Sequence, residues 1–420
     1  MRVKASLILL CRILLAAFCG WAVVHSMRIA RADWLASAGT LDGLERARRV
    51  VPDNAALLAR VALFRSDSGD SPATDVKELR SAARLNLLDS GLLIALGLRE
   101  EIALDPAAAE ADLVKAAEID HQFKPAWTLA NYYYRNNQPD KAAPFIQRML
   151  NLEPLGFDPA PVFELIWSQN DDYRNIFRLI PARGIRQVQY LQFLMTTHRV
   201  EAALDAWPTV LAADENSADV SAGPVLAGFP DFLLRADHVA ESVKVWNQLI
   251  DHKVIHAGHL DLAKGVAIAD PGFHSTPGTM LFGWHLADVP GVFASGFAGS
   301  ARLEISGDEP QEFRILSVLA PVIPSARYRL VWNSDGSRLS SAHDPGFAFR
   351  IVEQPGDRIT KCPPLLDADG LSSCDFEAQA GHEQDRASTA TIELQYIRAS
   401  GTTRVSGILE LTSAHLELGH

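Results

Sequence analysis

The sequence is poor in cysteine and in clustered basic residues. Its 420 residues include four cysteines, and no second Cys or His pair stands beside them in a zinc-ligand pattern. Lys and Arg number 39 against 51 Asp and Glu, which gives a formal net charge of −12. The densest basic run is Arg46, Arg48 and Arg49, and its helical pattern is typical of a solvated face. Because phosphate binding needs clustered cations, no nucleic-acid partner is expected.

Catalytic signatures are also missing from the sequence. It has no Gly-x-Ser-x-Gly elbow, phosphate loop, His-Glu-x-x-His pair or dinucleotide fingerprint. The spacing of His252, His256 and His259 would suit Zn²⁺ on a helix, but Gly258 interrupts that helix, so we expect surface histidines. We therefore expect no enzyme, no metal and no cofactor. The alternative is a hydrolase site assembled from distant residues in the C-terminal part.

Only one long hydrophobic run is present, from Ala5 to Val24, and a short basic flank precedes it. About 20 apolar residues in a helix span a bilayer core. Arg12 interrupts the run, but its stem can lie along the helix while its charge reaches the interface. Residues 1–26 are therefore predicted to be a transmembrane anchor or signal segment. As an anchor, they would hold a single-pass protein in the inner membrane with its bulk in the periplasm or outside.

A cleaved signal sequence is the alternative to an anchor. Ala30-Arg31-Ala32 has the small-x-small pattern of a cleavage site, although it lies well beyond the apolar run and follows Arg28. Cleavage at this triplet would make the protein secreted. Both alternatives export the remainder of the chain.

Two of the four cysteines, Cys11 and Cys19, lie inside the apolar run, where they are expected to be small apolar residues. The other two, Cys362 and Cys374, flank a loop-like stretch that begins with Pro363-Pro364. In an oxidising compartment they can close a short loop and stabilise the fold by about 2–4 kcal/mol. Two free thiols are the alternative. We expect the disulfide because the chain is predicted to be exported.

A pattern of about 34 residues repeats through the N-terminal half. Its clearest unit is residues 124–154, KPAWTLANYYYRNNQPDKAAPFIQRMLNLEP, and shorter matches to its end recur upstream in RARRVVP, SAARLNL and KAAEIDH. The ends of the four units are 35, 34 and 33 residues apart, at Pro52, Leu87, His121 and Pro154. In this length and in these motifs the pattern resembles the tetratricopeptide repeat.

The resemblance implies pairs of antiparallel helices over residues 27–155. Leu129 and Ala130 match the family's Leu-Gly positions and Tyr133 its aromatic position. Asn137 stands where the turn has Gly, and Asn tolerates left-handed backbone angles. Such arrays bind peptides on the face of their first helices. The residues expected on this partner-binding face are Trp127, Asn131, Tyr134 and Arg135. Packing of the tryptophan against a neighbouring helix is the alternative.

Helical patterning continues over residues 156–268 without the phase, so degenerate repeats or a helical cap are expected there. From residue 269 the period of the apolar residues is 2, which predicts an antiparallel β-sandwich over 269–420. The predicted strands are Met280–Leu286, Ala301–Ile305, Phe313–Leu319, Tyr328–Trp332, Phe347–Val352, Thr391–Ile397 and Ile408–Leu418.

The order of features in residues 269–420 resembles jelly-roll modules of the galactose-binding, carbohydrate-binding type. That resemblance implies a sugar-binding surface, on which Trp284 and Trp332 would stack against a glycan. Packing of both rings in the core is the alternative. The predicted fold class is thus α + β multidomain, with a transmembrane helix, an α-solenoid and a β-sandwich.

The leading hypothesis is a non-catalytic interaction scaffold, tethered to the membrane through residues 5–24 and exposed to the cell envelope. Its partner would be a protein or peptide on the helical face, with a glycan as an additional partner. By analogy with membrane-anchored proteins of this build, it would be accessory to surface polysaccharide assembly or export. The alternatives are a carbohydrate-binding protein that acts through the sandwich and an envelope hydrolase.

Overall fold

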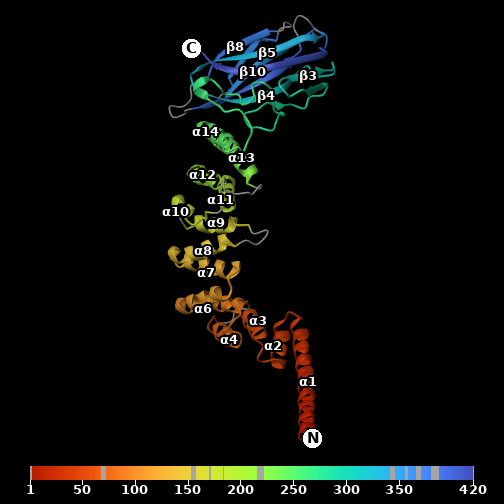
Figure 1. Ribbon diagram of the computed structural model, residues 1–420. Coiled ribbons are helices and arrows are strands. Elements are labelled where there is room, and N and C mark those ends of the chain that lie inside the picture. Colours follow the sequence, from red (N-terminus) through yellow and green to blue (C-terminus); the bar gives the residue numbers. More distant parts are fainter. Residues whose placement is uncertain are drawn as a thin grey trace. The chain divides into compact units, whose positions relative to one another are not determined.

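The computed structural model divides into two compact units, Met1–Ala182 and Arg183–His420, and each is described by itself (Figure 1). The structure describes residues 2–67, 72–152, 158–169, 172–182, 184–214, 222–340, 346–354, 358–365, 370–379 and 387–419. The first unit is helical. The second combines four helices with two antiparallel sheets.

The first unit begins with a helix of 35 residues, α1, Arg2–Ala36. From Arg12 onward it is long and apolar enough to span a membrane or to act as a signal sequence, with a mean hydropathy of 1.6. Its large apolar side chains, Phe18 and Trp21 among them, are exposed in the protein. At its end, Ala32 and Ala36 are buried in a cluster of repeat side chains.

Helix pairs follow α1, as the repeat pattern predicts. The helices are α2 Leu41–Val50, α3 Ala55–Asp67, α4 Pro72–Leu85, α5 Ser90–Ile102, α6 Pro106–Ile119, α7 Phe123–Arg135, α8 Pro139–Asn151, α9 Ala160–Trp167 and α10 Tyr173–Phe177. The second helices of the first three pairs are α2, α4 and α6. Each of these helices ends two residues before a predicted unit end: α2 before Pro52, α4 before Leu87 and α6 before His121. The fourth predicted end, Pro154, lies outside the described residues. The tetratricopeptide-like fold is thereby confirmed.

Small residues let the helices of a pair approach closely. Ala116, Ala130 and Ala142 are fully buried. At Gly97 of α5, an added Cβ would lie 2.7 Å from the Leu113 Cγ of α6, so a larger residue would force the two helices apart. The first unit therefore depends on small side chains at the positions where the repeat pattern has them.

First helices in both units end with the same hydrogen-bonded turn. The residue after the helix cap has a positive φ at four places: Leu104 (62°), Asn137 (54°), His198 (55°) and Asp237 (62°). Its N–H bonds the carbonyl three residues earlier, and the following N–H bonds the carbonyl five earlier, as from Asp105 to Glu100 at 2.9 Å. This is the Schellman termination. The prediction that Asn137 replaces the turn glycine is confirmed.

The second unit continues with α11 Gly184–Thr196, α12 Val200–Asp214, α13 Gly223–Arg235 and α14 Val239–Asp251, followed by a 3-10 turn, Leu262–Lys264. Helix α11 packs against α12 and α13 packs against α14, so these helices form two further pairs. Helix α14 contacts the sandwich: Trp246 packs edge-on against Phe282, with ring centroids 5.2 Å apart.

Within the described residues the sandwich has ten strands in two antiparallel sheets, ordered β1-β4-β9-β6-β7 and β2-β3-β10-β5-β8. The strands are β1 His285–Leu286, β2 Val292–Ser295, β3 Ala301–Ile305, β4 Glu312–Val322, β5 Arg327–Leu339, β6 Phe347–Gln354, β7 Arg358–Pro364, β8 Gly370–Glu377, β9 Ser388–Ile397 and β10 Gly407–Leu418. The predicted antiparallel sandwich is confirmed. The predicted strand Met280–Leu286 is extended only at its end, because a turn at Gly283 buries Phe282 and Trp284 in loop structure.

The predicted disulfide is present between Cys362 and Cys374, whose Cα atoms are 5.4 Å apart. The two cysteines lie in β7 and β8, which are edge strands of different sheets. The bond therefore joins the two layers at one side of the sandwich. The sequence places these residues beside a loop, whereas the structure places them within strands.

Candidate functional site

The predicted partner-binding face lies on α7. The Trp127 ring is half-buried and stacks on Phe123, with centroids 5.5 Å apart. Asn131 is also half-buried, and its Nδ2 donates to the Trp127 carbonyl at 2.9 Å. Both side chains therefore keep part of their surface available to a partner.

The other two residues predicted on this face behave differently. Arg135 forms a two-pronged ion pair with Glu101 of α5, with N···O distances of 3.1 and 2.7 Å. Tyr134 is only 5% exposed. Its placement on an open face is wrong, because its ring is packed in the core. Arg135 is exposed but already joins two successive first helices.

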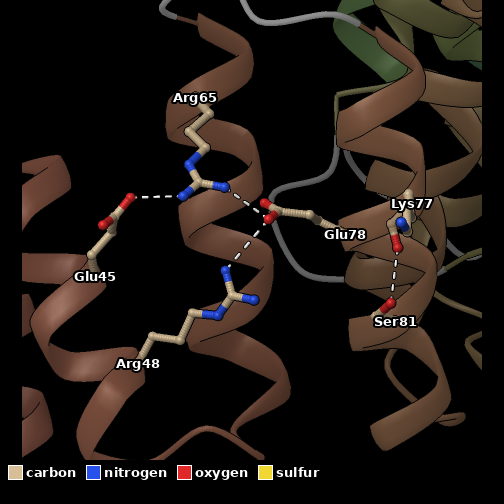
Figure 2. Close-up of polar contacts among 6 residues, drawn as sticks. All are labelled: Glu45, Arg48, Arg65, Lys77, Glu78 and Ser81. Carbon is tan, nitrogen blue, oxygen red and sulfur yellow. Dashed lines mark hydrogen bonds and ion pairs between the residues drawn. The ribbon is translucent and has the colours of Figure 1, made fainter.

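A second charged cluster joins the first repeats to each other. Figure 2 shows Arg65 of α3 between Glu45 of α2 and Glu78 of α4, with both N···O distances 2.7 Å. Arg48 adds a longer contact of 3.4 Å to Glu78. The hydrogen bond to Glu45 raises the pKa of Arg65 above its ordinary value. Three helices share these charges, so the cluster fixes their relative positions.

A buried carboxylate lies between the next two repeats. Glu100 of α5 is fully buried, and its Oε1 accepts from Arg80 Nη2 of α4 at 2.5 Å. Burial raises the pKa of Glu100. Glu100 stands three residues after Gly97, as Tyr133 stands three after Ala130, so it occupies the repeat's aromatic position. This ion pair joins α4 to α5 and so holds the two repeats together.

An apolar groove lies between α11 and α13. It encloses about 660 Å³. Its lining includes Gln192, Met195, Val225, Gly228, Asp231 and Phe232. At Gly228 an added Cβ would meet only the Met195 Cε, at 3.9 Å. The glycine therefore leaves open the space that a side chain would fill.

Polar groups border this groove. Arg235 and Asp231 pair within α13 at 2.7 Å. The His198 ring stacks near Phe232, with centroids 6.5 Å apart. An apolar floor with a few polar groups at its border suits a peptide segment better than a small charged substrate.

No sequence motif marks this groove, but the left-handed turn residues relate its two helices to α7. Counting back six residues from the positive-φ position gives Asn131 in α7, Gln192 in α11 and Asp231 in α13. Counting back two gives Arg135 and Arg235 in the first and last of these helices. The groove therefore occupies the helix face on which the sequence places the partner site.

Neither tryptophan proposed for sugar stacking is available on the sandwich. Trp284 is 3% exposed, and its Nε1 donates to the Asp270 carbonyl at 2.9 Å. Trp332 is fully buried and packs on Phe349, with centroids 5.1 Å apart. Their assignment to a stacking surface is wrong, because both rings fill the core between the sheets.

The surface hollows of the second unit's sandwich contain polar groups that are paired with each other. One, about 930 Å³, is bordered by the ion pair of Arg329 with Asp375 at 2.6 Å. Another, about 550 Å³, contains Asp270, whose carboxylate accepts from the N–H groups of His274 and Ser275 at 2.9 and 2.8 Å. Among the described residues, no group of three His, Cys, Asp or Glu side chains is arranged to hold a metal ion.

No family model matches the chain, and no curated protein matches it. Solved structures do. YrrB, described as a TPR protein with an unusual peptide-binding site, is 13% identical over 52% of this chain and 95% of its own, with a TM-score of 0.25. PilF of Pseudomonas aeruginosa is 12% identical over 48% and 92%, with a TM-score of 0.25.

A structure described as CBM4 is 10% identical over 36% of this chain and 100% of its own, with a TM-score of 0.25. TM-scores this low carry no argument about function. The fold rests on the features described above: helix pairs with Schellman terminations and a ten-strand sandwich. The chain is thus built from tetratricopeptide-like helix pairs and a jelly-roll-type β-sandwich.

Proposed function

We propose that this protein is a non-catalytic scaffold of the cell envelope, and that the groove between α11 and α13 binds an apolar segment of a partner protein. The observation that carries the proposal is the open volume of about 660 Å³ between two first helices. First helices are also where the repeat resemblance places the peptide face. The exposed part of Trp127 and Asn131 offers a second contact on the first unit.

The chemistry of the groove favours a peptide with apolar anchors. Phe232 and Met195 supply a rigid and a flexible apolar wall, and Met adapts its shape to different partners. Grooves of this kind bind helices or extended segments through a few buried apolar side chains. The polar groups at the border would set the orientation of the bound segment.

Two features support membrane tethering and exposure to the envelope. Helix α1 has the length and apolar surface of a membrane span. The bond between Cys362 and Cys374 is typical of proteins in an oxidising compartment. Together they favour a single-pass protein of the inner membrane with its bulk in the periplasm.

Filling the groove tests the proposal. Gly228→Phe places a ring in the open space beside Met195, and removal of a helix-interior glycine does not weaken α13. Ala227→Phe is the matched control, because the neighbouring side chain is exposed and does not line the groove. A photocrosslinker at Gln192 reports the partner in intact membranes. We expect adducts to disappear in Gly228→Phe and to persist in Ala227→Phe; equal adducts in both would reject the groove.

The place of the scaffold in surface polysaccharide assembly rests on analogy of build alone. Deletion of the gene should then reduce surface polysaccharide, and a chain carrying Gly228→Phe should fail to restore it. Binding of glycans is the competing function. Because Trp284 and Trp332 are buried, we expect the full chain to give no signal on a glycan array.

A further inference from the structure

The last part of α1 belongs to the first repeat. Ala32 and Ala36 are 1% and 2% exposed, and they lie in one apolar cluster with Leu44 and Ala47 of α2 and with Leu57 of α3. The helix shows no break between the apolar run and this packed end. One continuous helix therefore serves as the membrane segment and as the first helix of the first repeat.

Helix α2 runs back along α1 toward the apolar run. At its start, Gly43 lies against α1, where an added Cβ would be 2.6 Å from the Leu35 carbonyl oxygen. At its end, Arg28 Nη2 of α1 donates to the Val50 carbonyl at 2.7 Å. The turn between α2 and α3 is therefore level with Arg28. That residue is four positions beyond Val24, or about 6 Å along the helix axis.

The packed end of α1 limits where a bilayer can lie. Ala32 is covered by protein, so lipid cannot surround the helix at that level. The outer end of the span must then lie near Trp21 and Val24, whose side chains are exposed. An exposed tryptophan at this level is typical of the membrane–water interface. The turn after Val50 consequently falls at the depth of the lipid headgroups.

The surface at this level is basic. Arg28, Arg31 and Arg49 are all exposed, and Arg49 is one residue before the end of α2. The turn itself carries one carboxylate, Asp53. Asp33 is two residues after Arg31 in α1. Because each residue advances about 100° around the helix axis, Asp33 is on roughly the opposite side of α1 from Arg31. Lipid phosphates complement such a group of cations.

We propose that the turn between α2 and α3, with Arg28, Arg31 and Arg49, rests on the phosphate groups of the anionic bilayer that holds α1. The inference rests on the proposed membrane anchor. It also implies that α1 is retained. Cleavage after Ala32 would remove the Arg28 contact and part of the apolar cluster.

The experiment uses the full chain in nanodiscs of phosphatidylglycerol and phosphatidylcholine, with Cys11 and Cys19 changed to Ser. A fluorophore is attached at Pro52→Cys, on the exposed turn, or at Ala38→Cys, which is exposed at the opposite end of α2. A quencher carried on lipid headgroups reports contact with the membrane surface. We expect strong quenching at position 52 and none at position 38.

Charge reversal separates docking from anchoring. Arg31→Glu with Arg49→Glu should weaken quenching at position 52, and discs of phosphatidylcholine alone should do the same. Equal quenching at positions 52 and 38, or none at either while the chain stays in the disc, would overturn the docking surface and leave the anchor intact. A chain that does not enter discs would overturn the anchor and the docking surface together.

Discussion

Leu104 is the residue at which the backbone of the array is under most strain. It occupies the turn between α5 and α6 with a φ of 62°, where the other first-helix turns have Asn137, His198 and Asp237. A left-handed conformation costs a residue with a Cβ about 1–2 kcal/mol, and a branched apolar side chain offers no local hydrogen bond in return. The Leu104 side chain is 88% exposed, so packing does not compensate for the strain.

The substitution Leu104→Gly should therefore stabilise this repeat. Glycine removes the strain but gains conformational entropy in the unfolded chain, which costs about 0.5–1 kcal/mol. The net gain is about 0.5–1 kcal/mol, which slows local opening about two- to fivefold. Hydrogen exchange of the amides in α5 and α6 measures this opening directly, without assuming that the two-unit chain unfolds in one step.

The control is the same change at Leu88, which is 76% exposed and has no positive φ. Leu88→Gly gains the same entropy in the unfolded chain but relieves no strain, so it should speed exchange in α5. If Leu104→Gly also speeds exchange, then the turn is not strained and the reasoning fails. Leu104→Asn should fall between the two, because Asn adopts left-handed angles more readily than Leu.

Three further changes test other contacts. Changing Cys362 and Cys374 to Ala opens a loop with a separation of 12 residues and should cost about 3 kcal/mol in urea unfolding of the sandwich. Burial raises the pKa of Tyr133 from 10.0 to about 12. As pH rises, the unfolded chain therefore loses the tyrosine proton before the folded chain does, and the free energy of unfolding should fall between about pH 10 and 12. Tyr133→Phe should make that fall smaller. Arg65→Met should destabilise the first repeats by about 1–2 kcal/mol in thermal unfolding, against under 0.5 for the exposed pair lost in Arg46→Met.

The helical half was predictable because its determinants are local. The phase of the unit ends Pro52, Leu87 and His121 reproduces the ends of α2, α4 and α6 with a constant offset. The left-handed turn at Asn137 follows from the residue itself. Strand positions in the sandwich were predictable where apolar and polar residues alternate over a long run, but β2, β7 and β8 were not predicted, because their alternation is short or absent.

Side-chain roles were less predictable because they depend on distant partners. Spacing places Tyr134 on the partner-binding face, but the packing of neighbouring helices buries it. Trp284 and Trp332 are apolar enough for either a surface or a core, and only the pairing of the sheets decides for the core. The groove beside Gly228 depends on the distance between α11 and α13, which no local pattern specifies.

One difference in ion pairing between α7 and α13 bears on why the groove beside α13 is open. In the first unit Arg135 lies two residues before the left-handed residue Asn137, which follows α7. It pairs with Glu101 of α5, which lies three residues before the corresponding left-handed residue of that helix. The equivalent arginine in α13 is Arg235, but the equivalent of the glutamate is Met195, so this arginine pairs with Asp231 of its own helix. Bridging across first helices covers their shared face, whereas pairing within one helix leaves it open.

Met195→Glu should therefore restore the bridge and cover the groove. The new carboxylate would face Arg235 as Glu101 faces its arginine, with a coupling of about 0.2–1 kcal/mol at this exposed level. Crosslinking of the partner from Gln192 should fall. Met195→Gln is the control, since it has the same polarity change without the charge, and it should reduce crosslinking less. If the two variants reduce crosslinking equally, loss of the apolar floor accounts for the effect and the bridge does not form.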